Sequence, residues 1–125
     1  MDITQQAPKG SLQIVQSYGP GGFKVSGVRH QGSILVFPDA TLGWEVTSAA
    51  ELSLPSLSKI IEAEAPVELL IVGCGPALAM APTTLREVLK SKGIGFEAMD
   101  TGAACRTYNV LAGEGRKVAA GLIAL

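Results

Sequence analysis

The chain has 125 residues, of which ten are basic and eleven acidic, with a formal net charge of −1 and a mean hydropathy of +0.34. This length holds one domain and buries enough surface for an ordinary core without metals or disulfides. The balanced charge, without any block of like charges, argues against nucleic acid or an anionic membrane surface as partner. Charged residues make up only 17% of the sequence, against a norm near ~25%. This deficit indicates either tight packing of small residues or a surface covered by another subunit or client protein.

The N-terminal part of the chain carries strand patterns. Residues 1–10 are polar and predict a flexible tail, so that residues 11–125 form the single domain. Alternating or apolar runs bounded by Gly and Pro turns predict short strands. These strands are expected over 12–18, 23–27, 32–37 and, after a turn at 39–41, 42–46. Because the connecting turns are tight, we expect the strands to pair antiparallel.

From residue 54 onward the period changes to that of an α/β unit. Helical spacing predicts helices over 54–65, 83–93 and from about 103. In the second helix, Thr84 and Glu87 have capping-box spacing and Gly93 is the expected C-cap. Strands are expected over 67–73, 95–99 and 117–125, and the last strand, which has no charge after Lys117, should be central in the sheet. The order β-α-β-α-β favours parallel strands, so the fold class is mixed α/β.

One short segment, MDTGAACRTYNVL, gathers most of the chemically distinctive side chains. Thr101 is the predicted N-cap of the last helix. At 100° per residue, Cys105, Arg106 and Asn109 share one side, opposite an apolar arc that includes Tyr108. The segment is therefore either a solvated helix face, with Tyr108 as a core or rim aromatic, or part of a binding site.

A second candidate is the strand-end triplet Gly73, Cys74 and Gly75. Because ligand sites lie beyond the carboxyl ends of parallel strands, the turn at Asp100 and Thr101 should lie at the same edge of the sheet. The two turns would frame a crevice for a small anion at a helix N-terminus. A plain turn with glycines for close approach explains the same residues, and neither the dinucleotide pattern nor the Walker pattern is present.

The sequence offers no recognisable set of catalytic or metal-binding residues. Its one histidine, His30, is expected in an early turn or strand. Cys74 and Cys105 lack metal-ligand spacing, and both thiols are expected to be free in a reducing cytoplasm. We therefore predict no catalytic residue, no metal and no cofactor.

The predicted cellular location follows from the absence of targeting patterns in the sequence. The N-terminus lacks the apolar region of a secretory signal, and the uncharged run over 69–85 is interrupted by glycines and prolines. These patterns predict a cytoplasmic protein that is not integral to the membrane.

Several motifs together resemble a known family. They are IVGCG, GIGFEAMDTGAACRTYNVL, EGR and VAAGLIAL, with GPGGFKVSG, GSILVFP and W-x-V upstream. The string D-T-x-x-A-C-x-T-aromatic-N-x-L is the most specific of them. The chain resembles the Mth938-like domain family over residues 12–125; this family includes mitochondrial NADH dehydrogenase (complex I) assembly factor 3 and many bacterial proteins of unassigned function. The strand-end triplet, often G-T-G in the family, here has Cys74 in place of the hydroxyl residue.

The resemblance implies a three-layer fold around a mixed sheet and a non-enzymatic role. It implies an accessory protein, in the cytoplasm or peripheral to the membrane, that binds partially assembled respiratory-complex subunits. The residues expected to contribute to binding are Gly73, Cys74, Gly75, Asp100, Thr101, Cys105, Arg106, Tyr108 and Asn109. Arg106, Tyr108 and Asn109 would be the anchors.

Two further interpretations stay open at this point. One is a small-molecule-binding protein or thiol-dependent enzyme that uses the crevice between residues 73–75 and 100–106. There the helix dipole would lower the thiol pKa of Cys74 or Cys105. The other, compatible with either function, is a homo-oligomer.

Overall fold

The computed structural model describes residues 12–63, 65–76 and 83–125, so the predicted tail over 1–10 lies outside the described residues. The strands are β1 (Val15–Gly19), β2 (Gly22–Val25), β3 (Val28–Gln31), β4 (Ile34–Phe37), β5 (Ala40–Gly43), β6 (Leu69–Gly73), β7 (Gly95–Met99) and β8 (Val118–Leu122). The helices are the 3-10 helices η2 (Ala49–Glu51) and η3 (Pro55–Leu57), and the α-helices α1 (Ser58–Ile61), α2 (Thr83–Ser91) and α3 (Thr101–Gly113).

The strands form two sheets. A five-stranded mixed sheet has the order β5-β4-β8-β6-β7, in which β8, β6 and β7 are parallel and β4 is antiparallel to both β5 and β8. The mixed fold class, the β-α-β-α-β order and the central position of the last strand are therefore confirmed. The first three strands form a separate antiparallel sheet, β1-β2-β3, which the sequence prediction did not distinguish from the mixed sheet.

Residues with positive φ form the turn between β2 and β3 and the point at which the chain leaves the separate sheet. The two-residue turn between β2 and β3 consists of Ser26 and Gly27, with φ of 44° and 88°. Positive φ at both central residues gives the hairpin turn whose twist matches that of the flanking strands. Gly32, at φ 77°, then follows β3, where the chain leaves this sheet for the mixed one.

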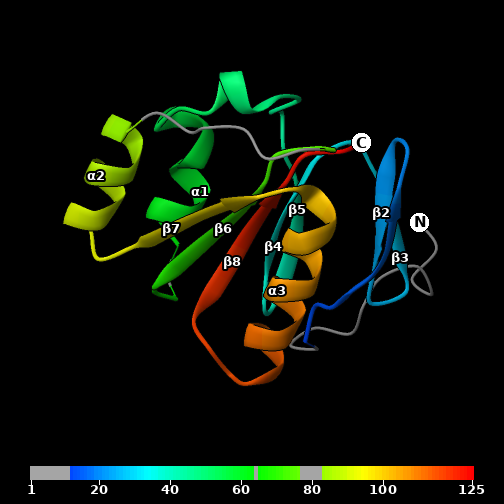
Figure 1. Cartoon of the computed structure of the whole chain (residues 1–125). Coiled ribbons are helices and arrows are strands. Elements are labelled where there is room, and N and C mark those ends of the chain that lie inside the picture. The colour runs from blue at the N-terminus through cyan, green and yellow to red at the C-terminus, as the bar shows by residue number, and fades with distance from the viewer. Residues whose placement is uncertain (1–11, 64, 77–82) are drawn as a thin grey trace.

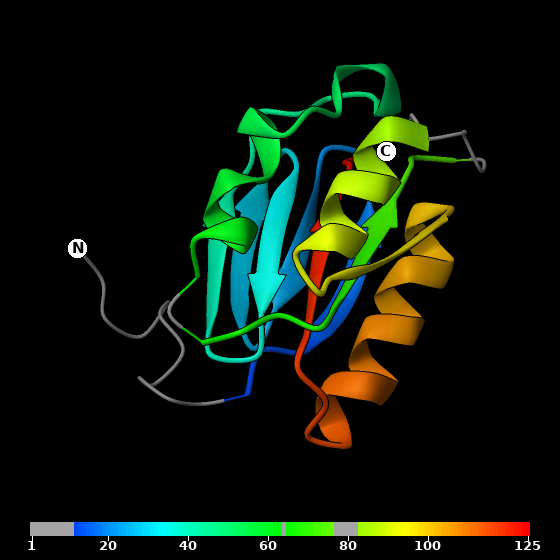
Figure 2. The same ribbon diagram turned by 90° about the vertical axis from the view of Figure 1, so that its left-hand side faces the viewer.

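Both faces of the mixed sheet are covered, which makes three layers (Figure 1). One face packs against α1, α2 and the 3-10 helices, as seen from their side in Figure 2. The other face packs against α3 and the three-stranded sheet. Strand β6 shows why a continuous apolar run was needed, since Leu70 and Val72 enter the first core and Ile71 enters the second.

Three predicted elements differ from the structure. The strand expected over 23–27 ends at Val25, because Ser26 and Gly27 form a turn, and β3 was not among the predicted strands. The helix expected over 54–65 is shorter and begins as a 3-10 helix: η3 runs directly into α1, which ends at Ile61. At its start, the Ser53 and Ser56 hydroxyls accept hydrogen bonds from each other's backbone N–H groups. The second strand of the β4–β5 hairpin is Ala40–Gly43 rather than 42–46, because the turn falls at Pro38 and Asp39.

Helix α2 ends as predicted but does not begin with the predicted cap. At its end, Gly93 has φ 79°; its N–H bonds the Lys90 carbonyl, and the Ile94 N–H bonds the Leu89 carbonyl. Because Thr83 is already helical, Thr84 lies inside the first turn and is not the N-cap.

Candidate functional site

The two predicted strand-end turns do meet at one edge of the mixed sheet. Strands β6 and β7 are parallel with Gly73 opposite Met99, so residues 73–75 and 100–101 follow the carboxyl ends of neighbouring strands. We call these five residues the strand-end rim. The Thr101 N–H bonds the Gly75 carbonyl at 2.9 Å, which places the two turns in direct contact.

The Thr101 hydroxyl closes this rim from inside. It is fully buried, donates to the Ile123 carbonyl at 2.8 Å and accepts from the Gly75 N–H at 2.9 Å. Thr101 is therefore not the N-cap, and that prediction is wrong. Asp100 is the cap, since its Oδ1 accepts from the Ala103 N–H at 2.9 Å.

Close approach explains Gly73 in the rim. A Cβ at this position would lie 2.9 Å from the Thr101 Cα and 3.1 Å from the Ala104 Cβ. The first turn of α3 therefore rests directly on the end of β6, and the residues that looked like a ligand cradle are in contact with each other. Cys74, next in the rim, is buried.

The α3 face predicted to carry Cys105, Arg106 and Asn109 is only partly exposed. Cys105 is buried in the core between α3 and the three-stranded sheet, and Asn109 is half-buried. The solvated-face interpretation is therefore wrong for these two residues, because β1 covers them. Arg106 is exposed and donates to the hydroxyl of Tyr18, at 3.4 Å.

Two polar side chains on α3 hold the segment that enters β1. The Val15 N–H donates to Asn109 Oδ1 at 2.9 Å, and Asn109 Nδ2 donates to the Val15 carbonyl at 2.8 Å. The side-chain amide thus pairs with β1 as a neighbouring strand would. The buried Tyr108 hydroxyl donates to the Gln13 carbonyl at 2.8 Å, so Tyr108 is a core aromatic as one interpretation expected.

The Cys105 thiol does not have the reactivity that the helix dipole suggested. Burial raises the pKa of Cys105 to about 12, although the nearby Arg106 charge acts in the opposite direction. The expected lowering of the Cys105 pKa is therefore wrong: desolvation of the thiolate dominates. Neither Cys74 nor Cys105 forms a disulfide, as predicted.

The strand-end rim gains neither a catalytic histidine nor a metal site from the residues that the structure describes. His30 lies on β3, opposite Phe23 of β2, and partial burial lowers its pKa. Within residues 12–63, 65–76 and 83–125, no group of three or more His, Cys, Asp or Glu side chains could hold a metal ion. No helix of these same segments is long and apolar enough to cross a bilayer.

Sequence reasoning missed Tyr18, which the structure places over the start of α3. The side chain is 42% exposed, and a Cβ on Gly102 would come within 2.5 Å of its hydroxyl. The signal available in the sequence was Gly102 itself, since a glycine in the first turn of a helix indicates a close neighbour.

Comparison with known proteins gives the family. Residues 15–123 match the family described as "Protein of unknown function (DUF498/DUF598)". NADH dehydrogenase (ubiquinone) 1 alpha subcomplex assembly factor 3 of Danio rerio is 38% identical over 110 residues, which are 88% of this chain and 63% of that protein. The chain thus spans less than two thirds of that relative's length.

Two bacterial proteins are also similar. An uncharacterized protein of Rhodobacter capsulatus is 35% identical over 114 residues, which are 91% of this chain and 86% of that protein. The solution structure of a Mth938-like domain from Bordetella pertussis superposes with a TM-score of 0.78 at 29% identity, covering 94% of this chain and 89% of that one. The chain therefore belongs to the DUF498/DUF598 family of Mth938-like domains.

Proposed function

We propose that this protein is a non-enzymatic, protein-binding accessory factor that helps to assemble a respiratory NADH dehydrogenase, in the cytoplasm beside the membrane complex. The observation that carries the proposal is the 38% identity, over 88% of this chain, to a protein named as an assembly factor of the NADH dehydrogenase alpha subcomplex.

The proposed contact surface is centred on Arg106, with Tyr18 beside it and Val110 one turn further along α3. Tyr18 is 42% exposed and Val110 is 60% exposed. Arginine and tyrosine are over-represented among residues that dominate binding energy, and an exposed valine adds apolar area.

The remaining residues of the predicted site support this surface from behind. The strand-end rim, Gly73, Cys74, Gly75, Asp100 and Thr101, fixes the start of α3 against the mixed sheet. Cys105, Tyr108 and Asn109 pack or bond α3 to the segment around β1. A contact surface on rigid elements loses little conformational entropy on binding.

Affinity purification after mild cross-linking tests the proposal. The tagged full chain is recovered from cells that produce it, beside an Arg106→Glu variant and a matched Arg116→Glu variant, since Arg116 is also exposed. We expect NADH dehydrogenase subunits to be enriched with wild type and Arg116→Glu, and reduced at least about tenfold with Arg106→Glu. Failure to recover any such subunit with wild type would contradict the assembly role. Equal recovery with all three proteins would contradict only the Arg106 surface.

A further inference from the structure

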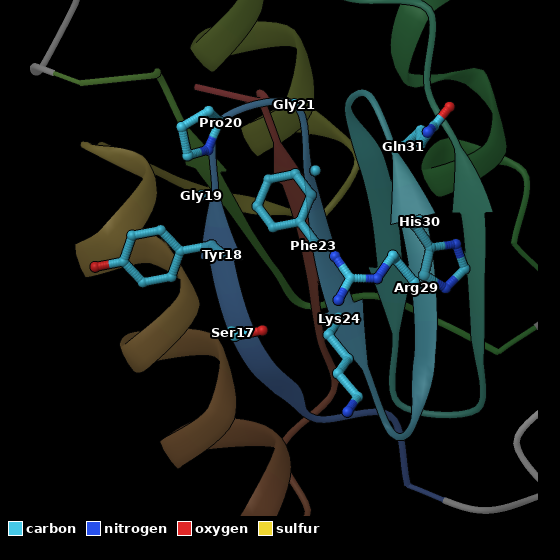
Figure 3. A pocket seen from close by; sticks show the side chains of 11 residues that line it. Ser17, Tyr18, Gly19, Pro20, Gly21, Phe23, Lys24, Arg29, His30 and Gln31 are labelled. Atoms are coloured by element: carbon cyan, nitrogen blue, oxygen red, sulfur yellow. The ribbon is translucent and has the colours of Figure 1, made fainter.

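One face of the three-stranded sheet carries exposed side chains that join neither core in the part of the chain that the structure describes. Ser17, Lys24 and Arg29 are directly opposite one another in register, so their side chains share a face. Phe23 and Val25 of β2 enter the core on the other side. We call the face that carries Ser17, Lys24 and Arg29 the outer face, and it contains a hollow of about 380 Å³ (Figure 3).

Glycines form the floor of this hollow. Gly19 pairs with Gly22, and Gly22 pairs with Gln31, at the end of the sheet near the β1–β2 turn. A Cβ on Gly19 would enter open space, so Gly19 leaves the surface bare there. A Cβ on Gly22 would collide with the carbonyl oxygen of His30, so Gly22 allows the close approach of β2 and β3. The hollow is therefore built into the backbone.

The charge of the hollow is one-sided. Lys24 and Arg29 are both exposed and face each other across β2 and β3. Neither side chain has an ion-pair partner among the residues that the structure describes. In those residues, Lys117 and Glu68 form an ion pair. The sequence from 15 to 31 contains no Asp or Glu. Like charges directly opposite in a sheet are destabilising, so folding gives no reason for this pair.

We propose that the outer face of β1–β3 binds an acidic segment of a protein partner, whose carboxylates pair with Lys24 and Arg29 above the glycine floor. Tyr18 and Pro20 line the same hollow and offer apolar contact to the rest of the segment. Tyr18, which lines the hollow, also accepts a hydrogen bond from Arg106, so the hollow adjoins the surface proposed for the assembly role. The inference rests on that proposed function, and it names the chemistry of the partner.

The openness of the site favours a peptide segment over a small free anion. An exposed ion pair contributes only about 0–1 kcal/mol, because water and salt screen it. One small oxyanion would therefore bind weakly, whereas a segment adds contact area on Tyr18, Pro20 and Gln31. Complementary charge would then set the rate of encounter and the choice of partner.

An NMR titration of the ¹⁵N-labelled full chain tests this inference without any respiratory partner. The probe is a hexaglutamate peptide, with hexaglutamine as the uncharged control and inorganic pyrophosphate as the small-anion arm. We expect hexaglutamate alone to shift amides of β1, β2 and β3, and the shifts to weaken as salt is raised.

Charge-removing variants make the titration specific. K24Q/R29Q removes both cations and relieves their repulsion, so its thermal midpoint should equal or exceed that of wild type. The matched control K90Q/K92Q removes two exposed cations from the region of α2. We expect hexaglutamate affinity to fall at least about tenfold in K24Q/R29Q and to stay unchanged in K90Q/K92Q.

Several outcomes would overturn the inference. They are absence of shifts at millimolar hexaglutamate, shifts centred outside β1–β3, and equal affinity of wild type and K24Q/R29Q. If pyrophosphate bound as tightly as hexaglutamate, the inference would also be overturned, because the site would then take a small anion rather than a peptide segment. Because the assay contains no NADH dehydrogenase subunit, a positive result stands even where affinity purification contradicts the assembly role.

Discussion

The strand-end rim and the outer face of β1–β3 are both rich in glycine, and they use it in opposite ways. In the rim, Gly73 lets α3 rest on the end of β6, and the buried Thr101 hydroxyl bonds groups from two strand ends. On the outer face, Gly19 borders open space beside Lys24 and Arg29, two cations without an ion-pair partner among the described residues. Glycine and polar residues near a strand end therefore indicate a binding site only where their polar groups are not already bonded within the protein.

The largest expected effect comes from removing the hydroxyl that closes the rim. Thr101→Val keeps the shape of the side chain but leaves the Gly75 N–H and the Ile123 carbonyl without their partner. We expect the free energy of unfolding in urea to fall by about 2–4 kcal/mol, because each buried unsatisfied group costs about 1–3 kcal/mol. The exposed Thr84→Val is the control and should change it by less than about 0.5 kcal/mol. An equal, small effect of both variants would show that the rim is not structural.

The second prediction concerns the reactivity of Cys105. Its pKa of about 12 leaves very little thiolate near pH 8, and the side chain is buried. In a Cys74→Ala background, iodoacetamide should label the native protein at least about a hundredfold more slowly than the urea-unfolded protein. Mass spectrometry of the alkylated chain measures both rates. Equal rates would mean that the α3–β1 contact opens readily and that Cys105 is available for chemistry.

The third prediction concerns the bonds between α3 and β1. Asn109→Ala leaves the Val15 N–H and carbonyl without partners in a half-buried position. We expect a loss of about 1–3 kcal/mol in the free energy of unfolding, with faster hydrogen exchange in β1 and little change in β6. Val110→Ala, on the exposed side of the same helix, is the control and should be nearly neutral. Uniform exchange changes across both sheets would contradict a local role of Asn109.

The smallest expected effect is a pH dependence at Glu51. Hydrogen bonds from Thr47 and Ser48 lower the pKa of the Glu51 carboxyl below its ordinary value of 4.5. Because the folded pKa is the lower one, the stabilisation is present above the ordinary pKa and is lost as pH falls through the folded pKa. Glu51→Gln should therefore have a lower thermal midpoint than wild type at pH 7, and the difference should shrink below about pH 4. A difference that grows toward acid pH would contradict this sign.

The sequence predicted most of the mixed sheet because patterns of burial are local. The run VELLIVG had to be covered on both faces, and β6 is. The last strand carries no charge after Lys117, and β8 lies between two neighbours. The end of α2 at Gly93 was predictable because a glycine C-cap depends only on the φ of the glycine and on the carbonyls of the preceding turn.

The candidate site was harder to predict because its contacts are between residues distant in sequence. Helical spacing correctly grouped Cys105 with Asn109, but it carries no information on which strand covers a helix face. Asn109 bonds Val15, 94 residues away. Thr101 bonds Ile123, 22 residues away, and this bond leaves Asp100 as the cap. The glycines of the β1–β2 turn were interpreted only as a turn, because the register that places Gly22 opposite Gln31 is a property of the sheet.

The central place of β8 also constrains how the chain reaches its native state. Hairpin β4–β5 and the β6–β7 pair touch through β8 alone in the strand order, and β8 is the last of these strands to leave the ribosome. Until Val118 and its neighbours exist, both half-sheets expose an unpaired inner edge. A nascent chain stalled before this point should be held by chaperones or aggregate, since such pairings between distant segments form late.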